Sequence, residues 1–122
     1  METSIDAVLP TLTEADAVAA LAALAQNMRL RIFRALVGAA PQGLTPGALS
    51  ATLDVPASTL SFHLKELVHA GLVTVEQEGR FLRYRANLAQ MQAMVAFLTA
   101  ECCGGEPGHC AGVSVTCTST SP

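Results

Sequence analysis

The sequence predicts a mainly α-helical domain with one small β-hairpin, in the element order α-α-α-α-β-β-α of a homodimeric winged helix-turn-helix. Two observations support this. Apolar residues recur at helical spacing through most of the chain, whereas the spacing changes to two between Gly71 and Arg85. A short helix, a tight turn, a helix with one polar face and a basic hairpin also follow one another in the order that this fold requires.

The first two helices are expected near the N-terminus. One runs from about Thr13 to Gln26, because Thr13 is a suitable N-cap and Asp16, three residues later, completes an imperfect capping box. Its apolar residues at helical spacing are Val18, Leu21, Ala22 and Ala25, with Leu24 beside them. The second runs from about Met28 to Ala39 and is ended by Pro41-Gln42-Gly43. Its apolar face comprises Met28, Ile32, Leu36 and Ala39.

The third and fourth helices are separated by a short turn, Asp54-Val55-Pro56. Thr45 is the expected cap of a third helix that starts with Pro46 and ends near Leu53. A fourth helix is expected from Pro56 to Ala70 and is stopped by Gly71. Its buried residues are expected to be Leu60, Leu64, Leu67 and Val68. The remaining surface has groups suited to base edges and phosphates, namely Ser58, Thr59, Ser61, Phe62, His63 and Lys65.

A hairpin and a fifth helix complete the domain. The hairpin is expected from Leu72 to Arg85, with a turn at Glu78-Gly79-Arg80 that places Arg80 at its tip. The fifth helix runs from about Leu88 to Glu101, with an apolar stripe of Leu88, Met91, Val95 and Leu98. The glycine, serine and threonine content of the rest predicts a flexible tail. The expected divisions are an extension (1–12), a helical domain (13–101) and a cysteine-containing tail (102–122).

The charge distribution is asymmetric. The net charge is -3, yet all seven lysines and arginines lie between Arg29 and Arg85, where only four acids oppose them, so this segment has a charge of +3. Such a centre suits contact with DNA, although an ordinary solvated surface accounts for the charge equally well.

The apolar stretches are too short to cross a membrane, so no membrane partner is expected. The first sixteen residues contain acids and neither lysine nor arginine, which argues against a secretory signal. A cytoplasmic location with reduced thiols is therefore expected.

Cys102 and Cys103 are adjacent, and Cys110 follows seven residues later. Neighbouring cysteines rarely pair with each other, because the ring of such a disulfide is strained. Together the three thiolates suit one soft ion, such as trivalent arsenic or antimony, which takes three sulfur ligands in a pyramid. Zinc or cadmium remains an alternative if His109 or Cys117 adds a fourth ligand, and thiol oxidation is another.

These residues resemble the ArsR/SmtB family of metal-responsive repressors over about Ala20 to Leu98. The most specific segments are Leu24–Ile32, Ser58–Leu67, Ala70–Val73 and Glu78–Tyr84. The resemblance implies a homodimer that binds double-stranded operator DNA and leaves it when an ion binds. A metal carrier that uses the fold only as a dimer scaffold is a weaker alternative. No acid–base pair, phosphate loop or open zinc site indicates an enzyme.

Two departures from the family pattern direct attention to the tail. Many arsenic sensors of the family have a Cys-x-Cys pair in the third helix. This chain has Gly47-Ala48-Leu49-Ser50 in that region and therefore no thiol. Zinc sensors of the family use Asp and His ligands on the fifth helix. This chain has Gln90 and Gln92 in that region instead. The resemblance is therefore to the branch of arsenite sensors whose cysteines follow the last helix.

A dimer interface is expected between the first and fifth helices of two chains. Their apolar stripes have no obvious second layer within so small a domain. The residues predicted to form the interface are Leu21, Leu24, Met91, Val95 and Leu98. Met94 is expected to join Met91 in the dimer core rather than to act as a ligand.

Overall fold

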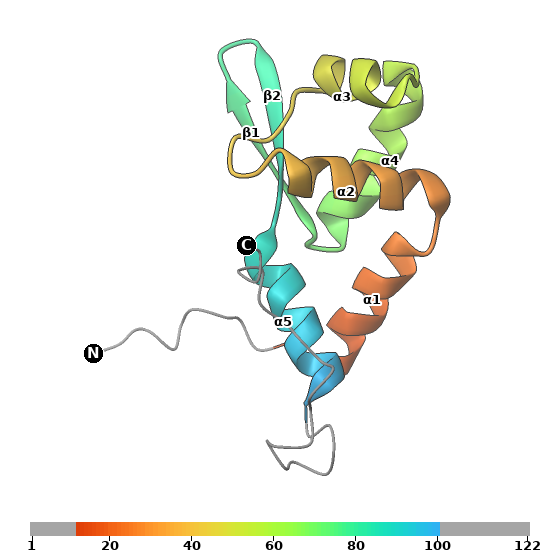
Figure 1. The fold of residues 1–122 in the computed structure, drawn as a ribbon, viewed down its shortest axis with the longest axis vertical. Helices are drawn as coiled ribbons and strands as arrows, with labels where there is room; N and C mark the ends of the chain where they lie inside the picture. The colour runs from red at the N-terminus through yellow and green to blue at the C-terminus, as the bar shows by residue number, and fades with distance from the viewer. Residues whose placement is uncertain (1–11, 101–122) are drawn as a thin grey trace, which may run out of the picture.

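The computed structural model describes residues 12–100, which form five α-helices and one two-stranded antiparallel sheet. The elements are α1 (Glu14–Leu24), α2 (Asn27–Gly38), α3 (Pro46–Leu53), α4 (Ala57–His69), β1 (Val73–Glu78), β2 (Phe81–Ala86) and α5 (Leu88–Thr99). Figure 1 shows α2, α3, α4 and the hairpin in one half of the molecule, with α1 and α5 in the other. The predicted element order is confirmed.

Side-chain caps set the helix boundaries. The predicted capping box of α1 is present, with Thr13 accepting from the Asp16 amide and Asp16 accepting from the Thr13 amide. The end predicted at Gln26 is wrong, because Gln26 has an extended backbone and caps α2 through the Arg29 amide. Helix α5 ends at Thr99, short of the predicted limit, because Ala100 adopts an extended conformation with ψ of 135°.

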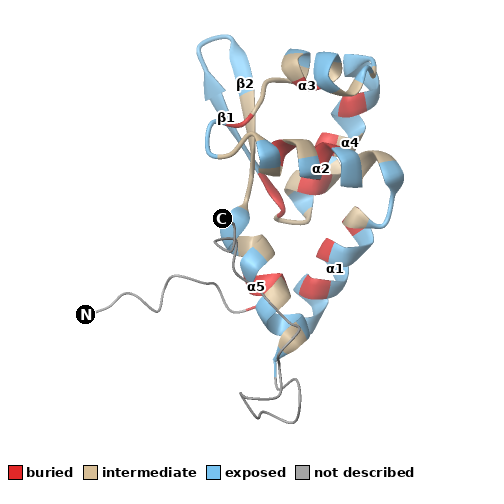
Figure 2. Ribbon diagram, in the orientation of Figure 1, coloured by how far each residue is buried: buried red, intermediate tan, exposed pale blue. Residues whose placement is uncertain are grey.

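The core lies between α2, α4 and the base of the hairpin, where buried positions gather in Figure 2. The largest fully buried side chains are Ile32, Leu36, Leu49, Leu60, Leu64, Leu67, Leu72 and Val73. Burial of each such side chain stabilises the fold by roughly 1.5–3 kcal/mol. Three residues of the predicted apolar faces, Met28, Ala39 and Val68, are only half-buried, and Phe33, outside the predicted face of α2, is buried.

Helices α1 and α5 bury small or flexible side chains rather than the predicted stripes. The buried residues of α1 are Ala17, Ala20 and Ala23, and those of α5 are Ala93 and Met94. The prediction that Met94 belongs to a dimer core is therefore wrong, because it is buried within its own chain. The packed domain also begins before the predicted residue 13, since the side chain of Leu12 is buried in the core.

The hairpin is regular and is fastened to the helices at its base. Its register pairs Val73 with Ala86 and Glu78 with Phe81, so the turn contains two residues, Gly79 and Arg80, rather than the predicted three. The left-handed φ of Gly79, 65°, fits this tight turn.

A second attachment joins the hairpin to the loop between α2 and α3. Leu44 and Tyr84 exchange two backbone hydrogen bonds of 2.9 Å. Gly43 precedes this bridge with a φ of 77°, and a Cβ atom on it would lie 2.6 Å from the Arg85 Cγ and overlap the Tyr84 carbonyl oxygen. Glycine is therefore required here both by the backbone conformation and by the close approach of β2.

Substitution of Gly43→Ala is expected to lower the free energy of unfolding by about 2–4 kcal/mol, because it adds backbone strain to a steric overlap. Gly47→Ala is a matched control, since Gly47 lies in α3 with nothing within 4 Å of the added Cβ. The control is expected to stabilise by less than about 1 kcal/mol. Urea denaturation followed by circular dichroism measures both, and equal midpoints would contradict the assigned constraint.

Candidate nucleic-acid interface

Helix α4 has one buried and one exposed face. Leu60, Leu64 and Leu67 fix the buried face in the core. The opposite face is open to solvent and comprises Ser58, Thr59, Ser61, Phe62 and Lys65. Phe62 is 59% exposed although it is large and apolar. The structure therefore brings five of the six predicted residues of this helix together on one accessible surface.

His63 differs from the other predicted contacts because it faces a neighbouring helix. Its Nδ1 atom lies 3.4 Å from an Arg29 guanidinium nitrogen, and its side chain is half-buried. Arg29 also donates a 2.7 Å hydrogen bond from Nε to the Ala23 carbonyl. Arg29 thus ties together α1, α2 and α4, and the prediction that His63 lies on the open polar face is wrong.

The first turn of α4 lacks a side-chain cap. Pro56 occupies the N-cap position and has no side-chain acceptor. The backbone amides of Ala57 and Ser58 therefore donate no hydrogen bond to a capping side chain. The other four described helices have side-chain caps from Thr13, Gln26, Thr45 and Asn87. A helix start with unsatisfied amides and the positive end of the helix dipole favours a negatively charged partner.

The basic residues of the hairpin have two different environments. Arg83 pairs with Glu78 at 2.8 Å, whereas Arg85 pairs with Glu76 at 2.8 Å and with Glu78 at 3.2 Å. Hydrogen bonds from Arg83 and then Arg85 hold the pKa of the Glu78 carboxyl below its usual value. The hydrogen bond to Glu78 likewise raises the pKa of Arg85. Much of the hairpin's positive charge is therefore balanced within the hairpin.

Three exposed cations make no ion pair or side-chain hydrogen bond within residues 12–100. They are Arg34 on α2, Lys65 on α4 and Arg80 at the hairpin tip. Arg31 is different, because it donates to the Leu53 carbonyl at 3.2 Å and supports α3. Lys65 and Arg80 belong to the two elements expected to meet DNA.

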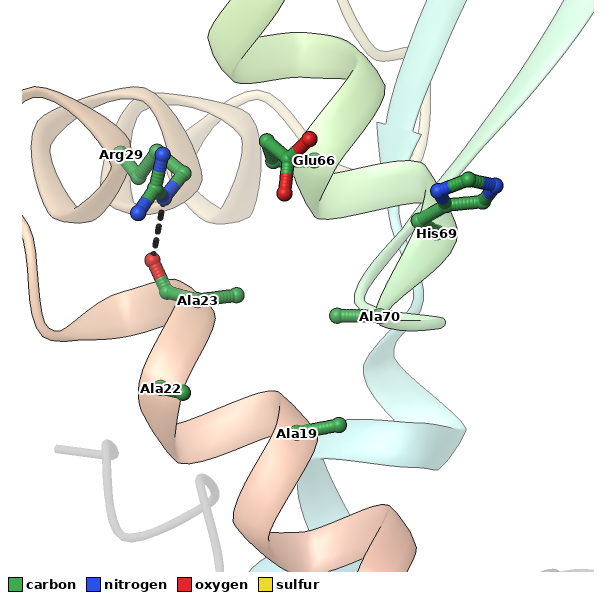
Figure 3. A pocket seen from close by; sticks show the side chains of 7 residues that line it. All are labelled: Ala19, Ala22, Ala23, Arg29, Glu66, His69 and Ala70. Atoms are coloured by element: carbon green, nitrogen blue, oxygen red, sulfur yellow. Dashed lines mark hydrogen bonds between the residues drawn. The ribbon is translucent and has the colours of Figure 1, made fainter.

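A groove of about 400 Å³ separates the exposed face of α4 from the hairpin. Its lining residues are Ser61, Lys65, Val68, His69, Val75 and Tyr84. A second hollow of about 260 Å³ lies where α1, α2 and α4 meet, and Figure 3 shows Arg29, Glu66 and the alanines of α1 around it. The groove between α4 and the hairpin adjoins the polar face of α4.

The apolar stripes predicted to form a dimer interface are only partly exposed. Leu21 and Leu98 are 42% and 56% exposed, whereas Leu24, Met91 and Val95 are half-buried. Two further exposed apolar residues lie on the same helices outside the predicted interface, Val18 at 59% and Phe97 at 39%. Val18 belongs to the predicted apolar stripe of the first helix, and the alanine face of α1 is the signal that places it outside the core.

The predicted ion ligands lie beyond the described part of the chain. These are Cys102, Cys103, Cys110, His109 and Cys117. Within residues 12–100, no group of three or more histidine, cysteine, aspartate or glutamate side chains could hold a metal ion. Among the described helices, none is both long and apolar enough to span a membrane.

Comparisons with known proteins agree with this arrangement. A family model described as a helix-turn-helix domain matches residues 24–76. A protein of Halobacterium salinarum named as an arsenical resistance operon repressor, ArsR, is 37% identical over 83 residues, covering 68% of this chain. The match spans 63% of that relative's length. The transcriptional activator HlyU of Vibrio cholerae is 34% identical, covering 69% of this chain and 75% of HlyU.

Solved structures have the same fold. An ArsR-like transcriptional regulator from Rhodococcus sp. RHA1 superimposes with a TM-score of 0.63 at 31% identity, covering 80% of this chain and 88% of that one. The homodimeric winged helix-turn-helix domain of Mb0332 from Mycobacterium bovis has a TM-score of 0.57 at 24% identity, covering 76% and 82%. The predicted winged helix-turn-helix architecture is thus confirmed.

Replacement of Glu78→Gln is expected to lower the thermal midpoint at neutral pH by removing the acceptor shared by Arg83 and Arg85. Because the folded pKa lies below the ordinary value of 4.5, this stabilisation is present above pH 4.5 and is lost as the pH falls through the folded pKa. The midpoint gap between parent and variant should therefore close in acid. It should also shrink in high salt, since the pairs are exposed. A gap that stays constant from neutral to acid pH would contradict the role of this carboxylate.

Proposed function

The chain belongs to the ArsR family of DNA-binding transcriptional regulators, which are not enzymes, and we propose that it is a homodimeric repressor released from operator DNA by trivalent arsenic or antimony. The observation that supports DNA binding best is the exposed face of α4, with its uncapped first turn, beside a hairpin whose tip cation lacks a protein partner within the described residues. Operator DNA as partner implies that the protein acts in the cytoplasm.

In this proposal, α4 enters the major groove. Ser58, Thr59 and Ser61 have short polar groups for base edges, and the exposed ring of Phe62 suits a thymine methyl group. Lys65 and Arg80 attract the phosphates of the DNA with their positive charges. Arg80 reaches the minor groove beside the major groove that holds α4. His63 contributes at most from the edge of this surface, because its ring is half-buried against Arg29.

Two chains associate through α1 and α5 in this proposal. A single chain exposes large apolar side chains to solvent on both helices. These are Val18 and Leu21 on α1 and Phe97 and Leu98 on α5. The half-buried side chains of Leu24, Met91 and Val95 lie on the same helices. A two-fold axis at this surface would set two α4 helices about one helical turn of DNA apart, which matches a palindromic site.

The inducer site is proposed at Cys102, Cys103 and Cys110. Cys102 follows the end of α5 at Thr99 by three residues, so an ion held by these thiolates would be tied to one of the proposed dimerisation helices. The name of the Halobacterium relative supports an arsenical inducer. Three thiolates without an assigned fourth ligand favour a metalloid with pyramidal coordination over zinc with tetrahedral coordination. Zinc would need His109 or Cys117 as its fourth ligand.

Release follows from linkage between the two sites. Ion binding at the end of α5 would shift one chain relative to the other, and a displacement of about 1–2 Å at a two-fold interface is enough to spoil the simultaneous fit of both α4 helices. The ion must then bind the DNA-free dimer more tightly. Operator DNA must lower ion affinity by the same factor, commonly about 5–150-fold.

A second candidate function is an activator or a regulator controlled by thiol oxidation. The specific observation in its favour is that the chain covers 75% of HlyU, which is named a transcriptional activator. Oxidation of the cysteines in place of ion binding is a separate alternative for the trigger.

Sedimentation equilibrium is expected to give the mass of two chains at micromolar concentration. Leu98→Asp should yield monomers, because it places a charge in the proposed interface, while helical circular dichroism stays unchanged. Leu30→Asp is the matched control, since Leu30 is 43% exposed on α2 and lies outside the stripes. A monomeric parent, or a Leu98→Asp protein that remains dimeric, would overturn the proposed interface.

Fluorescence anisotropy on the chain's own promoter DNA tests the switch, with arsenite, antimonite, zinc and peroxide as titrants. Serine at Cys102, Cys103 or Cys110 should leave DNA binding intact and abolish release by arsenite. Cys117→Ser is the matched control and should retain most of the response. Release of the Cys102→Ser protein at the parent's arsenite concentration would exclude the proposed site. Release by peroxide alone would favour the oxidation alternative.

A further inference from the structure

The hollow where α1, α2 and α4 meet contains two opposite charges that do not pair with each other. Arg29 of α2 and Glu66 of α4 both line this space of about 260 Å³. Both side chains are half-buried, but no ion pair or hydrogen bond joins them. Figure 3 shows them on different sides of the hollow. The Glu66 carboxylate has no other partner within residues 12–100, so it loses hydration without the compensation of a protein contact.

Arg29 is held in place by its neighbours, although part of its guanidinium still lacks an acceptor. Its Nε atom donates to the Ala23 carbonyl at 2.7 Å, and Nη1 lies 3.4 Å from the Nδ1 atom of His63. The other terminal nitrogen, Nη2, makes no hydrogen bond with the part of the chain that the structure describes. A guanidinium that is oriented in advance binds a carboxylate with little further loss of side-chain freedom. Arg29 is therefore a fixed anchor for an anionic group in the hollow.

The rest of the hollow is largely apolar. Ala19 and Ala22 line it from α1, and Ala70 lines it from the end of α4. The two alanines of α1 are exposed in the single chain. Methyl groups at these positions leave room beside the two charges that longer side chains would fill. A ligand that matches the hollow therefore combines an apolar part with both a negative and a positive group.

From these contacts we propose that the hollow binds a small zwitterion, namely an α-amino acid with an apolar side chain. Its carboxylate pairs with Arg29, its ammonium group pairs with Glu66, and its side chain contacts the alanines. A ligand with only one charge is disfavoured, because Glu66 repels a simple anion and Arg29 repels a simple cation. Drug-sized ligands occupy pockets of about 300–1,000 Å³, so this hollow suits a smaller molecule such as an amino acid.

Such a ligand bridges three helices. It links the charges of α2 and α4 and covers exposed alanines of α1, the helix whose buried residues are all alanines. Binding is therefore expected to stabilise the folded chain, because only the folded chain brings these groups together. The site uses neither the cysteines nor DNA, so the proposal does not rest on the proposed function.

Titration of the isotope-labelled full chain, followed through its amide resonances, tests the site. The probes are L-alanine, L-valine, L-leucine, L-isoleucine, L-methionine and L-phenylalanine. The amino acid that binds most tightly is then compared with the acid that lacks its amino group and the amine that lacks its carboxyl group. The intact amino acid is expected to shift the amides around Ala22, Arg29 and Glu66, with a Kd at least about tenfold below that of either fragment. No shift with any of the probes, or equal affinity of amino acid and fragments, would overturn the proposal.

Two substitutions locate the ligand. Glu66→Gln keeps the shape of the side chain and removes its charge, so it should weaken the amino acid about tenfold and leave the fragment without an amino group unaffected. Ala22→Leu fills the hollow and should abolish binding. Ala15→Leu is the matched control, since Ala15 is exposed on the same helix and does not line the hollow. Undiminished affinity in Glu66→Gln, or equal losses in the two leucine variants, would refute the assigned site.

Discussion

The burial of one face of α4 determines the arrangement of everything around it. Leu60, Leu64 and Leu67 are fully enclosed by the core, and a helix fixed by three such residues cannot rotate about its axis without exposing them. The same constraint holds the polar face of α4 outward. The surface that meets a partner is thus a consequence of packing on the other side of the helix.

Much of this fold could be predicted from the sequence because its signals are local. The cap at Thr45, Pro46 at the first turn of α3 and the change of period after Gly71 all act within a few residues. The misplaced residues depend instead on tertiary contacts. His63 stands three residues after Leu60 and four before Leu67, so it borders the buried face of α4, and its partner Arg29 is thirty-four positions away. No local pattern encodes that pairing.

The charge of the hairpin illustrates a second limit of sequence reasoning. Arg83 and Arg85 contribute to a basic segment when charges are counted along the chain, but the antiparallel register places Glu76 and Glu78 within reach of them. Ion pairs on such an exposed surface contribute little to stability. Their larger effect is on the charge of the hairpin, where Arg80 at the tip is the one cation without an ion pair among the described residues.

The alanine face of α1 has a consequence for the order of events in folding. Ala17, Ala20 and Ala23 let α1 approach the core closely, but a methyl group returns only about 0.8 kcal/mol on burial. The centre of the domain, with its enclosed leucines, is accordingly expected to exchange most slowly, and α1 is expected to open before it in an isolated chain. In the proposed dimer, association would stabilise α1, and the ordering of α1 would rise with protein concentration.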